Sequence, residues 1–261
     1  MHPFLFSVFG LHVPTYGLFS VAALLVAIAI IRRYARVEGL DPTRMTDAVV
    51  LTVAVGFVGA RVFELAINWE RYFASPGGLK LVPFTTGVYL GALITGIPFG
   101  VFWFRRIGVP ILQGLDIVGL VAAVALTLGR WGCFFSGCCW GTPTALPWAV
   151  TYPEAGRRLH QGLPGVPVHP TQIYESIAAL AILGGLVLVY RRKRFDGQIV
   201  ILFVALYSAV RFLLEFVRGD AERGFVLGGL LSTSQFLGTG LFVLAVVSYA
   251  VLDRRRRNVA A

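Results

Sequence analysis

Charged side chains stand inside long apolar stretches of this sequence. Arg61 and Glu64 are three residues apart and Arg211 and Glu215 are four apart, so each pair shares one helix face. Arg130 closes another apolar stretch. A charge at the centre of a bilayer helix costs about 2.5–3.5 kcal/mol, so each needs a reason. Converging arginines would bind a phosphate or another anion, whereas pairs that only neutralise themselves would merely pack the helices.

All three cysteines lie in one seven-residue window, 133–139, which reads CFFSGCC. Four interpretations stay open. The thiols can simply fill a packed turn, or Cys133 can form a disulfide with Cys138 or Cys139. The C-x4-C-C spacing without a neighbouring histidine is atypical of zinc sites. A thiol can also act as a nucleophile or exchange with a partner thiol.

The composition indicates which class of protein must position these groups. Of 261 residues, 57% are hydrophobic and only 14% charged, against roughly 25% charged in ordinary soluble domains. This excludes a disordered chain, a disulfide-stapled mini-protein and most soluble enzymes. The net charge of +10 would favour nucleic acid in a soluble protein, but in a membrane protein basic loops set the topology. We therefore expect membrane lipid, and no nucleic acid, as a partner.

Seven apolar stretches approach the length of about 20 residues that crosses a bilayer. They predict an all-α polytopic membrane protein with about seven transmembrane helices, forming a single integral membrane domain over residues 1–261. The first stretch has no basic residue before it and no A-x-A-like exit, so we interpret it as a retained span rather than a signal peptide. The stretches cover approximately 13–31, 46–67, 84–104, 110–129, 171–190, 197–217 and 233–252.

Basic residues divide unequally between the two sides of these spans. Fourteen lie in the loops and tail of one side, and seven lie in the longer loops of the other. Because lysine and arginine accumulate in cytoplasmic loops, the N-terminus is predicted outside and the C-terminus in the cytoplasm. The longest outer segment, about 130–170, is rich in Gly, Pro, Trp and Cys and is predicted to be irregular. Irregular backbone at a membrane must be buried in protein or line a wet cavity, which is typical of functional segments.

Five sequence runs resemble the prolipoprotein diacylglyceryl transferase family. That family carries a signature of the form G-R-x-G-N-F-x-N-G-E-x-x-G, and this chain has GRWGCFFSGCCWG at 129–141. The glycine frame, Arg130, Phe134 and Gly141 match. The other similar runs are TYGL at 15–18, GARVFE at 59–64, HPTQIYE at 169–175 and LYSAVRFLLEFVRGD at 206–220.

The resemblance implies a reaction and roles for residues. The diacylglyceryl group of phosphatidylglycerol would move to the lipobox cysteine thiol of a preprolipoprotein, with glycerol phosphate leaving and a thioether forming. Both substrates, the signal peptide of the preprolipoprotein included, are thus implied partners. No metal or organic cofactor is implied. The implied catalytic residues are Arg130, Arg211 and Glu215, and the implied substrate-binding residues are Tyr16, Arg61, Cys133, Gly141, His169 and Tyr207.

The chain also departs from the family pattern. The family's third span carries F-H-G-G-L, whereas GVYLGAL at 87–93 places Leu90 at the histidine position. Two signature asparagines are replaced by Cys133 and Ser136, and the acidic residue by Cys138. The base that would deprotonate the acceptor thiol is therefore open. His169 and His160 are candidates, although His169 can equally buttress the loop.

Two functional hypotheses follow. The first is the transferase, acting in the bacterial inner membrane at its outer leaflet. The second is a divergent member that has lost transfer and acts as a membrane thiol-redox or lipid-binding protein through its three cysteines. The arginines favour the first and the cysteine substitutions keep the second open.

Overall fold

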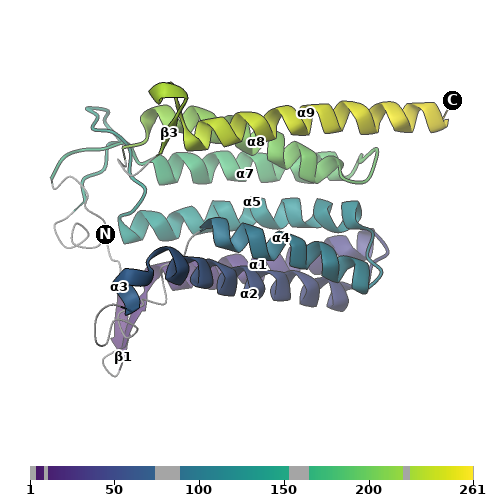
Figure 1. The fold of residues 1–261 in the computed structure, drawn as a ribbon, viewed down its shortest axis with the longest axis horizontal. Coiled ribbons are helices and arrows are strands. Elements are labelled where there is room, and N and C mark those ends of the chain that lie inside the picture. The colour runs from purple at the N-terminus through teal and green to yellow at the C-terminus, as the bar shows by residue number, and fades with distance from the viewer. Residues whose placement is uncertain (1–3, 9–10, 74–88, 153–164, 220–223, 261) are drawn as a thin grey trace. The chain divides into compact units, whose positions relative to one another are not determined.

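The computed structural model describes all residues except 1–3, 9–10, 74–88, 153–164, 220–223 and 261. The chain forms two compact units, residues 31–114 and residues 1–30 with 115–261, which we describe separately. Helices dominate both (Figure 1). Among the described residues, six helices are long and apolar enough to cross a membrane, so the chain is an all-α polytopic membrane protein. The predicted side of each terminus stays a prediction.

The unit of residues 31–114 is built on two helices, α2 (Pro42–Ile67) and α4 (Tyr89–Arg106), with the short α3 (Trp69–Phe73) after α2. Glycines let α2 and α4 approach closely. A Cβ on Gly91 of α4 would lie 2.6 Å from the carbonyl oxygen of Gly59 on α2, and Gly59 in turn faces Thr95. Such contacts between small residues are the usual way in which membrane helices pack.

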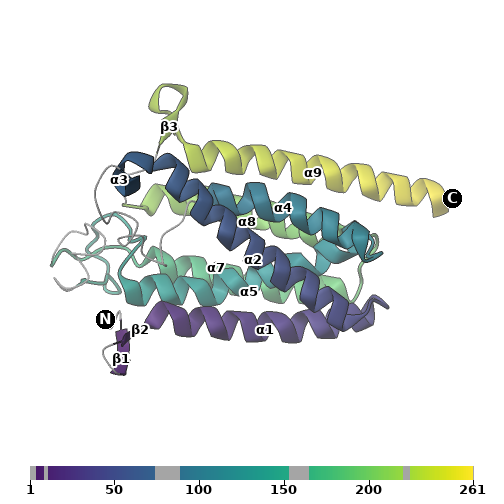
Figure 2. The ribbon, with the colours of Figure 1, turned by 60° about the horizontal axis from the view of Figure 1, so that its bottom comes forward.

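The other unit contains most of α1 (Thr15–Val37) and the helices α5 (Ile111–Ser136), α7 (Thr171–Tyr190), α8 (Gln198–Leu214) and α9 (Thr233–Ala260). Helix α8 packs against α7 and α9 (Figure 1), and α1 lies beside α5 (Figure 2). A 3₁₀ turn, η2 (Glu215–Val217), ends α8, and a second, η3 (Leu227–Gly229), joins two short strands. The strands form two hairpins, β1 (Phe4–Val8) with β2 (Leu11–Pro14) and β3 (Phe225–Val226) with β4 (Leu231–Ser232).

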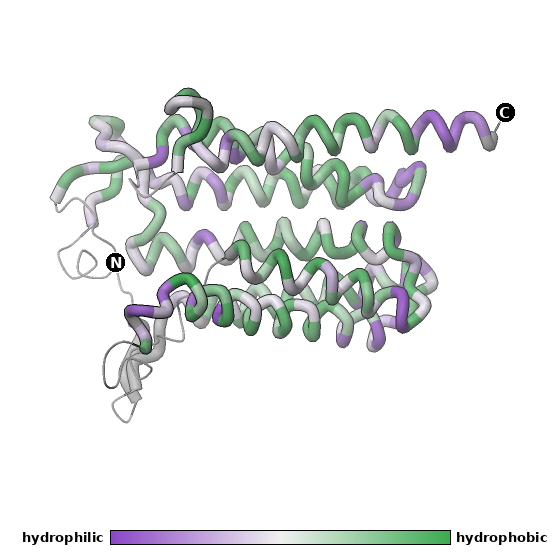
Figure 3. The backbone as a smooth tube through the Cα atoms, viewed as in Figure 1, coloured by the Kyte–Doolittle hydropathy of each residue, from purple (hydrophilic) through white to green (hydrophobic). Residues whose placement is uncertain are grey.

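Six of the predicted spans correspond to the six long apolar helices. The stretch predicted at 84–104 corresponds to α4, which has 18 residues, ends in two arginines and is not one of the six. Its residues 84–88 lie outside the described part of the chain. Helix α9 continues beyond its predicted end through the four arginines at 254–257, where the tube turns hydrophilic (Figure 3).

The predicted start of the outer irregular segment is wrong. Helix α5 does not stop near residue 129 but continues to Ser136, and the irregular chain begins at Gly137 with a φ of 76°. Gly129 and Gly132 lie inside α5, since glycine is common inside membrane helices. The first proline after them is Pro143, so no residue before Gly137 forces the helix to end. Helix α5 therefore carries Arg130 and Cys133 inside its last two turns.

A buried carboxylate fixes the start of α8 at the opposite end of this unit from the cysteines. Asp116 of α5 has no exposed surface. Its carboxylate accepts hydrogen bonds from the backbone N–H groups of Gly197, Ile199 and Val200 at 2.9, 2.8 and 3.1 Å. Lys193 places its ammonium 3.3 Å from the same carboxylate. The carboxylate thus occupies the helix N-terminus, where backbone donors and the helix dipole favour a negative charge.

Asp116→Ala is expected to lower the free energy of unfolding by about 3–5 kcal/mol, because Lys193 and the α8 N–H groups lose a buried partner. The thermal unfolding midpoint of the purified protein in detergent measures this. Asp41→Ala is the matched control: Asp41 caps α2 through Thr43 and Arg44, but its side chain is half exposed. That change is expected to cost only about 1 kcal/mol. Equal shifts for the two variants would contradict the role given to Asp116.

Candidate active site

Arg130 is the centre of a polar cluster formed by three helices. Its Nη2 donates to Oε1 of Glu175 at 2.8 Å, and the Tyr207 hydroxyl donates to the same oxygen at 2.6 Å. The three residues come from α5, α7 and α8. The side chain of Arg130 is 17% exposed and that of Glu175 only 5%. A buried guanidinium is thus held by a carboxylate on one side, which leaves other N–H donors of the fork for a ligand.

A second arginine pair stands one turn further along α8. Arg211 lies 2.8 Å from the carboxylate of Glu215, as the four-residue spacing predicted, and its Nη2 donates to Ser234 Oγ of α9 at 3.4 Å. Tyr207 and Arg211 are four residues apart on α8 and share a face. The two arginine clusters therefore belong to the same end of the same unit.

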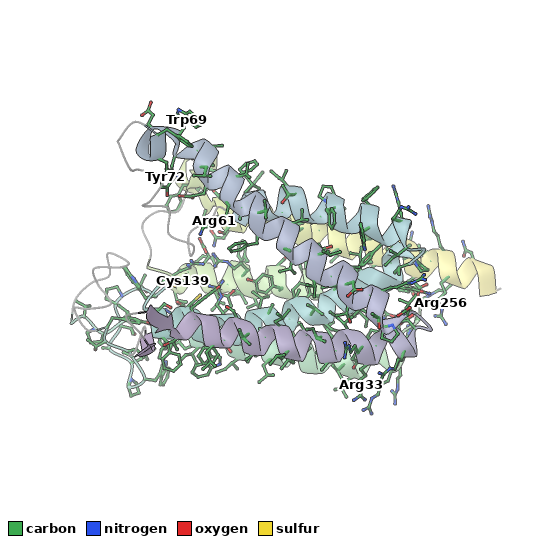
Figure 4. The ribbon with its side chains drawn as sticks, turned by 90° about the horizontal axis from the view of Figure 1, so that it is seen from below. Arg33, Arg61, Trp69, Tyr72, Cys139 and Arg256 are labelled. Atoms are coloured by element: carbon green, nitrogen blue, oxygen red, sulfur yellow. The ribbon has the colours of Figure 1, made fainter. Side chains whose placement is uncertain are left out.

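The three cysteines meet at the end of α5. Cys133 occupies its last turn, and Cys138 and Cys139 occupy the turn that follows. Their three sulfur atoms all lie within 4.8 Å of one another, and all three thiols are free (Figure 4 labels Cys139). The disulfide considered from the sequence is thus not formed in this structure. Cys139 has a φ of 62°, which is uncommon for a residue other than glycine.

Helix α7 holds this turn by its first residues. Thr171 Oγ1 donates to the carbonyl of Cys139 at 2.6 Å, and Gln172 Nε2 donates to the carbonyl of Cys138. Gln172 also donates to the Tyr152 hydroxyl at 2.9 Å. Burial raises the pKa of Tyr152 to about 12, against the lowering effect of the Gln172 bond, so this phenol stays neutral. The turn is therefore fixed by hydrogen bonds from two side chains of α7.

The pKa values of two of the three thiols are shifted in opposite directions. Hydrogen bonds from the thiols of Cys133 and Cys138 lower the pKa of Cys139, and the charges of Arg130 and Arg218 act in the same direction against the effect of burial. The pKa of Cys138 is raised, chiefly by its hydrogen bonds with the other two thiols and by burial.

Gly141 and His169 join the irregular segment to the helices. The Gly141 N–H donates to the carbonyl of His169 at 2.9 Å, and the His169 N–H donates to the carbonyl of Thr142 at 3.0 Å. A Cβ on Gly141 would lie 2.5 Å from that of His169 and 2.6 Å from the Val217 carbonyl. These close contacts within the protein itself explain why residue 141 must be a glycine. The His169 ring contacts the Tyr174 hydroxyl at 3.3 Å, so among the described contacts this histidine buttresses the loop.

Of two further predicted substrate-binding residues, Tyr16 lies next to the cysteine turn and Arg61 belongs to the other unit. Tyr16, at the start of α1, is 46% exposed, and its ring covers Gly132 of α5. Arg61 lies in the other unit, on α2 (Figure 4). Its guanidinium lies over the ring of Phe57. On the same helix Glu64 accepts hydrogen bonds from Asn68 and Tyr72. His160 is outside the described residues, and Leu90, at the position of the family's histidine, is 54% exposed on α4.

Sequence reasoning missed Glu175 as a site residue. Its signal was present, since an ionisable residue at the start of an apolar stretch is expensive unless it has a partner. Glu175 also ends the HPTQIYE run, whose first residue is the candidate base His169. Thr171 and Gln172, which hold the cysteine turn, belong to the same run and gave no such signal.

Known proteins resemble this chain over nearly its full length. The sequence profile of the prolipoprotein diacylglyceryl transferase family matches residues 3–251. A phosphatidylglycerol–prolipoprotein diacylglyceryl transferase of Clostridium tetani is 30% identical over 261 residues, which are 99% of this chain and 100% of the relative. Proteins of the same name from Geobacter sulfurreducens and Symbiobacterium thermophilum are 34% and 31% identical, covering 97% and 92% of this chain and 96% and 88% of theirs. The chain therefore belongs to the prolipoprotein diacylglyceryl transferase family.

Proposed function

We propose that this protein transfers the diacylglyceryl group of phosphatidylglycerol to the lipobox cysteine of preprolipoproteins in the bacterial cytoplasmic membrane. The observation that carries the proposal is the buried Arg130, held on Glu175 beside the cysteine turn. Such a guanidinium is suited to a lipid phosphate, because it stays charged when desolvated and offers several N–H donors in a fixed plane. Membership of the family supports these substrates and this reaction.

The acceptor sulfur must attack a glyceryl carbon while the phosphate leaves. Arg130 would hold the phosphate and stabilise the charge that develops as glycerol phosphate departs. Arg211, fixed by Glu215 and Ser234, would contribute a second positive charge one turn further along α8. Tyr207 and Glu175 would orient Arg130. Tyr16 and Arg61 stay proposed contacts to lipid or peptide, as do Gly141, His169 and Cys133.

A direct transfer assay tests this function. The purified protein, in nanodiscs that contain phosphatidylglycerol, is mixed with a synthetic lipobox peptide, and mass spectrometry follows the gain of one diacylglyceryl group on the peptide. We expect transfer that stops when the peptide cysteine is replaced by serine. Growth of a strain depleted of its own transferase, rescued by this chain, is the matching test in cells.

The convergence of three thiols supports one alternative, a membrane thiol-redox or lipid-binding protein that no longer transfers the group. Absence of transfer under conditions in which the Geobacter relative is active would favour this alternative. A disulfide between two of the three cysteines, formed and reduced reversibly in the purified protein, would add to it.

A further inference from the structure

The cysteine cluster has the form of a metal-ligand set. Three sulfur atoms lie within 4.8 Å of one another, and no fourth Cys, His, Asp or Glu of the described chain joins the group. A tetrahedral zinc ion with Zn–S bonds of about 2.3 Å holds its sulfurs about 3.8 Å apart. The thiols would therefore approach one another by at most about 1 Å, a change that side-chain rotation can supply.

The backbone around the cluster is preorganised. Cys139 adopts a left-handed conformation that costs free energy for any residue with a Cβ, and it persists only where the surroundings impose it. Those surroundings are Thr171 and Gln172, whose side chains hold the carbonyls of Cys139 and Cys138. Simple packing of small residues would not need two polar side chains of another helix to fix the turn.

We propose that Cys133, Cys138 and Cys139 bind one zinc ion whose fourth position receives the thiol of the acceptor cysteine. This inference rests on the proposed function, because it assigns the activation of that thiol to the metal. It also replaces the expectation from the sequence that no metal takes part. Three protein ligands with an open fourth position are the arrangement of catalytic zinc sites, and the partial burial of all three cysteines leaves a side for a fourth ligand.

The chemistry of the transfer requires that the acceptor thiol be activated. Only a thiolate attacks carbon efficiently, and the histidine that the family places in the third span is Leu90 here. A thiol that coordinates zinc is deprotonated outright near neutral pH. The positive charges of Arg130 and Arg218 act on the cluster and would offset part of the negative charge that zinc with four thiolates carries.

The proposed step is balanced without an oxidant or reductant. The acceptor thiol releases its proton to solvent when it coordinates the metal. Its sulfur then forms a C–S bond with the terminal glyceryl carbon of the diacylglyceryl group. The bond from that carbon to the phosphate oxygen breaks, and glycerol phosphate departs with the electron pair beside Arg130.

The same chemistry argues against a covalent intermediate on one of the enzyme's own cysteines. Attack by Cys139 on the lipid would produce a thioether on the enzyme. A thioether is also the stable end product of the reaction, so this intermediate would not pass the lipid on. The thiols are therefore better suited to hold a metal than to accept the lipid.

Metal analysis of the intact protein tests the site. The protein is purified in detergent through a tag without histidine, and its metal content is measured by mass spectrometry. We expect about one zinc per chain. In cobalt-substituted protein, thiolate-to-cobalt charge-transfer absorption is expected, and the lipobox peptide should change this spectrum only when its cysteine is present.

Single changes of each cysteine to serine are expected to weaken zinc binding by more than about 100-fold, since loss of an outer partner alone typically costs about 10–100-fold. Ser136→Ala is the matched control, because it alters the same segment without removing a sulfur. If a serine variant does not fold, chelation of zinc from the unchanged protein gives the same information. Transfer should then stop, and should return when zinc is restored.

The outcomes separate this inference from the proposed function. Transfer by fully metal-free protein would overturn the zinc site and leave the transferase standing. A spectrum that responds to the peptide thiol, without any transfer, would support the site and refute the transferase. A chain that carries a disulfide and binds no metal after reduction would overturn the site in favour of redox chemistry.

Discussion

Replacing Arg130 with alanine is expected to lower the rate of diacylglyceryl transfer by at least about 10²–10³-fold, the loss typical of one preorganised donor to a developing negative charge. Arg130 is largely buried and held by Glu175. Its guanidinium can therefore stabilise the developing charge without changing its orientation during the reaction. The loss should fall mainly on kcat, because charge on the leaving phosphate increases in the transition state. The transfer assay with the lipobox peptide measures both constants.

Two further variants make this result specific. Arg130→Lys keeps the charge but loses the planar fork, so it should recover only part of the rate. Arg44→Ala removes an arginine that forms an exposed ion pair with Asp41, and it should leave transfer unchanged. An Arg130→Ala protein as active as the unchanged one would remove Arg130 from the site.

Replacing Glu175 with glutamine is expected to have the second-largest effect. One carboxylate oxygen of Glu175, Oε1, accepts hydrogen bonds from both Arg130 and Tyr207. The side chain of Glu175 is almost fully buried. The neutral amide leaves the Arg130 charge without its counterion, which typically costs about 3–5 kcal/mol when the pair is buried. We expect a lower thermal unfolding midpoint and slower transfer, since the guanidinium is no longer held in one orientation.

A double-mutant cycle distinguishes positioning from general damage to the fold. If Glu175 acts on transfer through Arg130, Glu175→Gln should slow an Arg130→Ala protein little further, and the two effects should be strongly non-additive. Glu175→Asp, which keeps the charge on a shorter side chain, should restore part of the rate. Additive losses in the cycle would show that Glu175 does not act through Arg130.

Local patterns predicted much of this architecture. Helices α1, α2, α7 and α8 match apolar stretches visible in the sequence, because spanning a bilayer requires about 20 apolar residues in a row. The ion pair of Arg211 with Glu215 followed from their four-residue spacing, which the geometry of one helix fixes.

Contacts between distant segments were not predictable in this way. Glu175 meets Arg130 across 45 residues, and Asp116 meets the start of α8 across more than 80. No local spacing encodes either pair, because each depends on which helices become neighbours. The end of α5 was misplaced for a related reason, since glycine inside a membrane helix does not reveal where that helix stops.

The cysteines show most clearly what the sequence determined and what the tertiary structure added. The sequence by itself determined that this is a polytopic membrane protein of a transferase family, and that an arginine lies close to three cysteines along the chain. Only the tertiary structure decided that the three sulfur atoms meet. Their convergence depends on the left-handed backbone of Cys139 and on the hydrogen bonds from α7, and a spacing rule for cysteines contains neither.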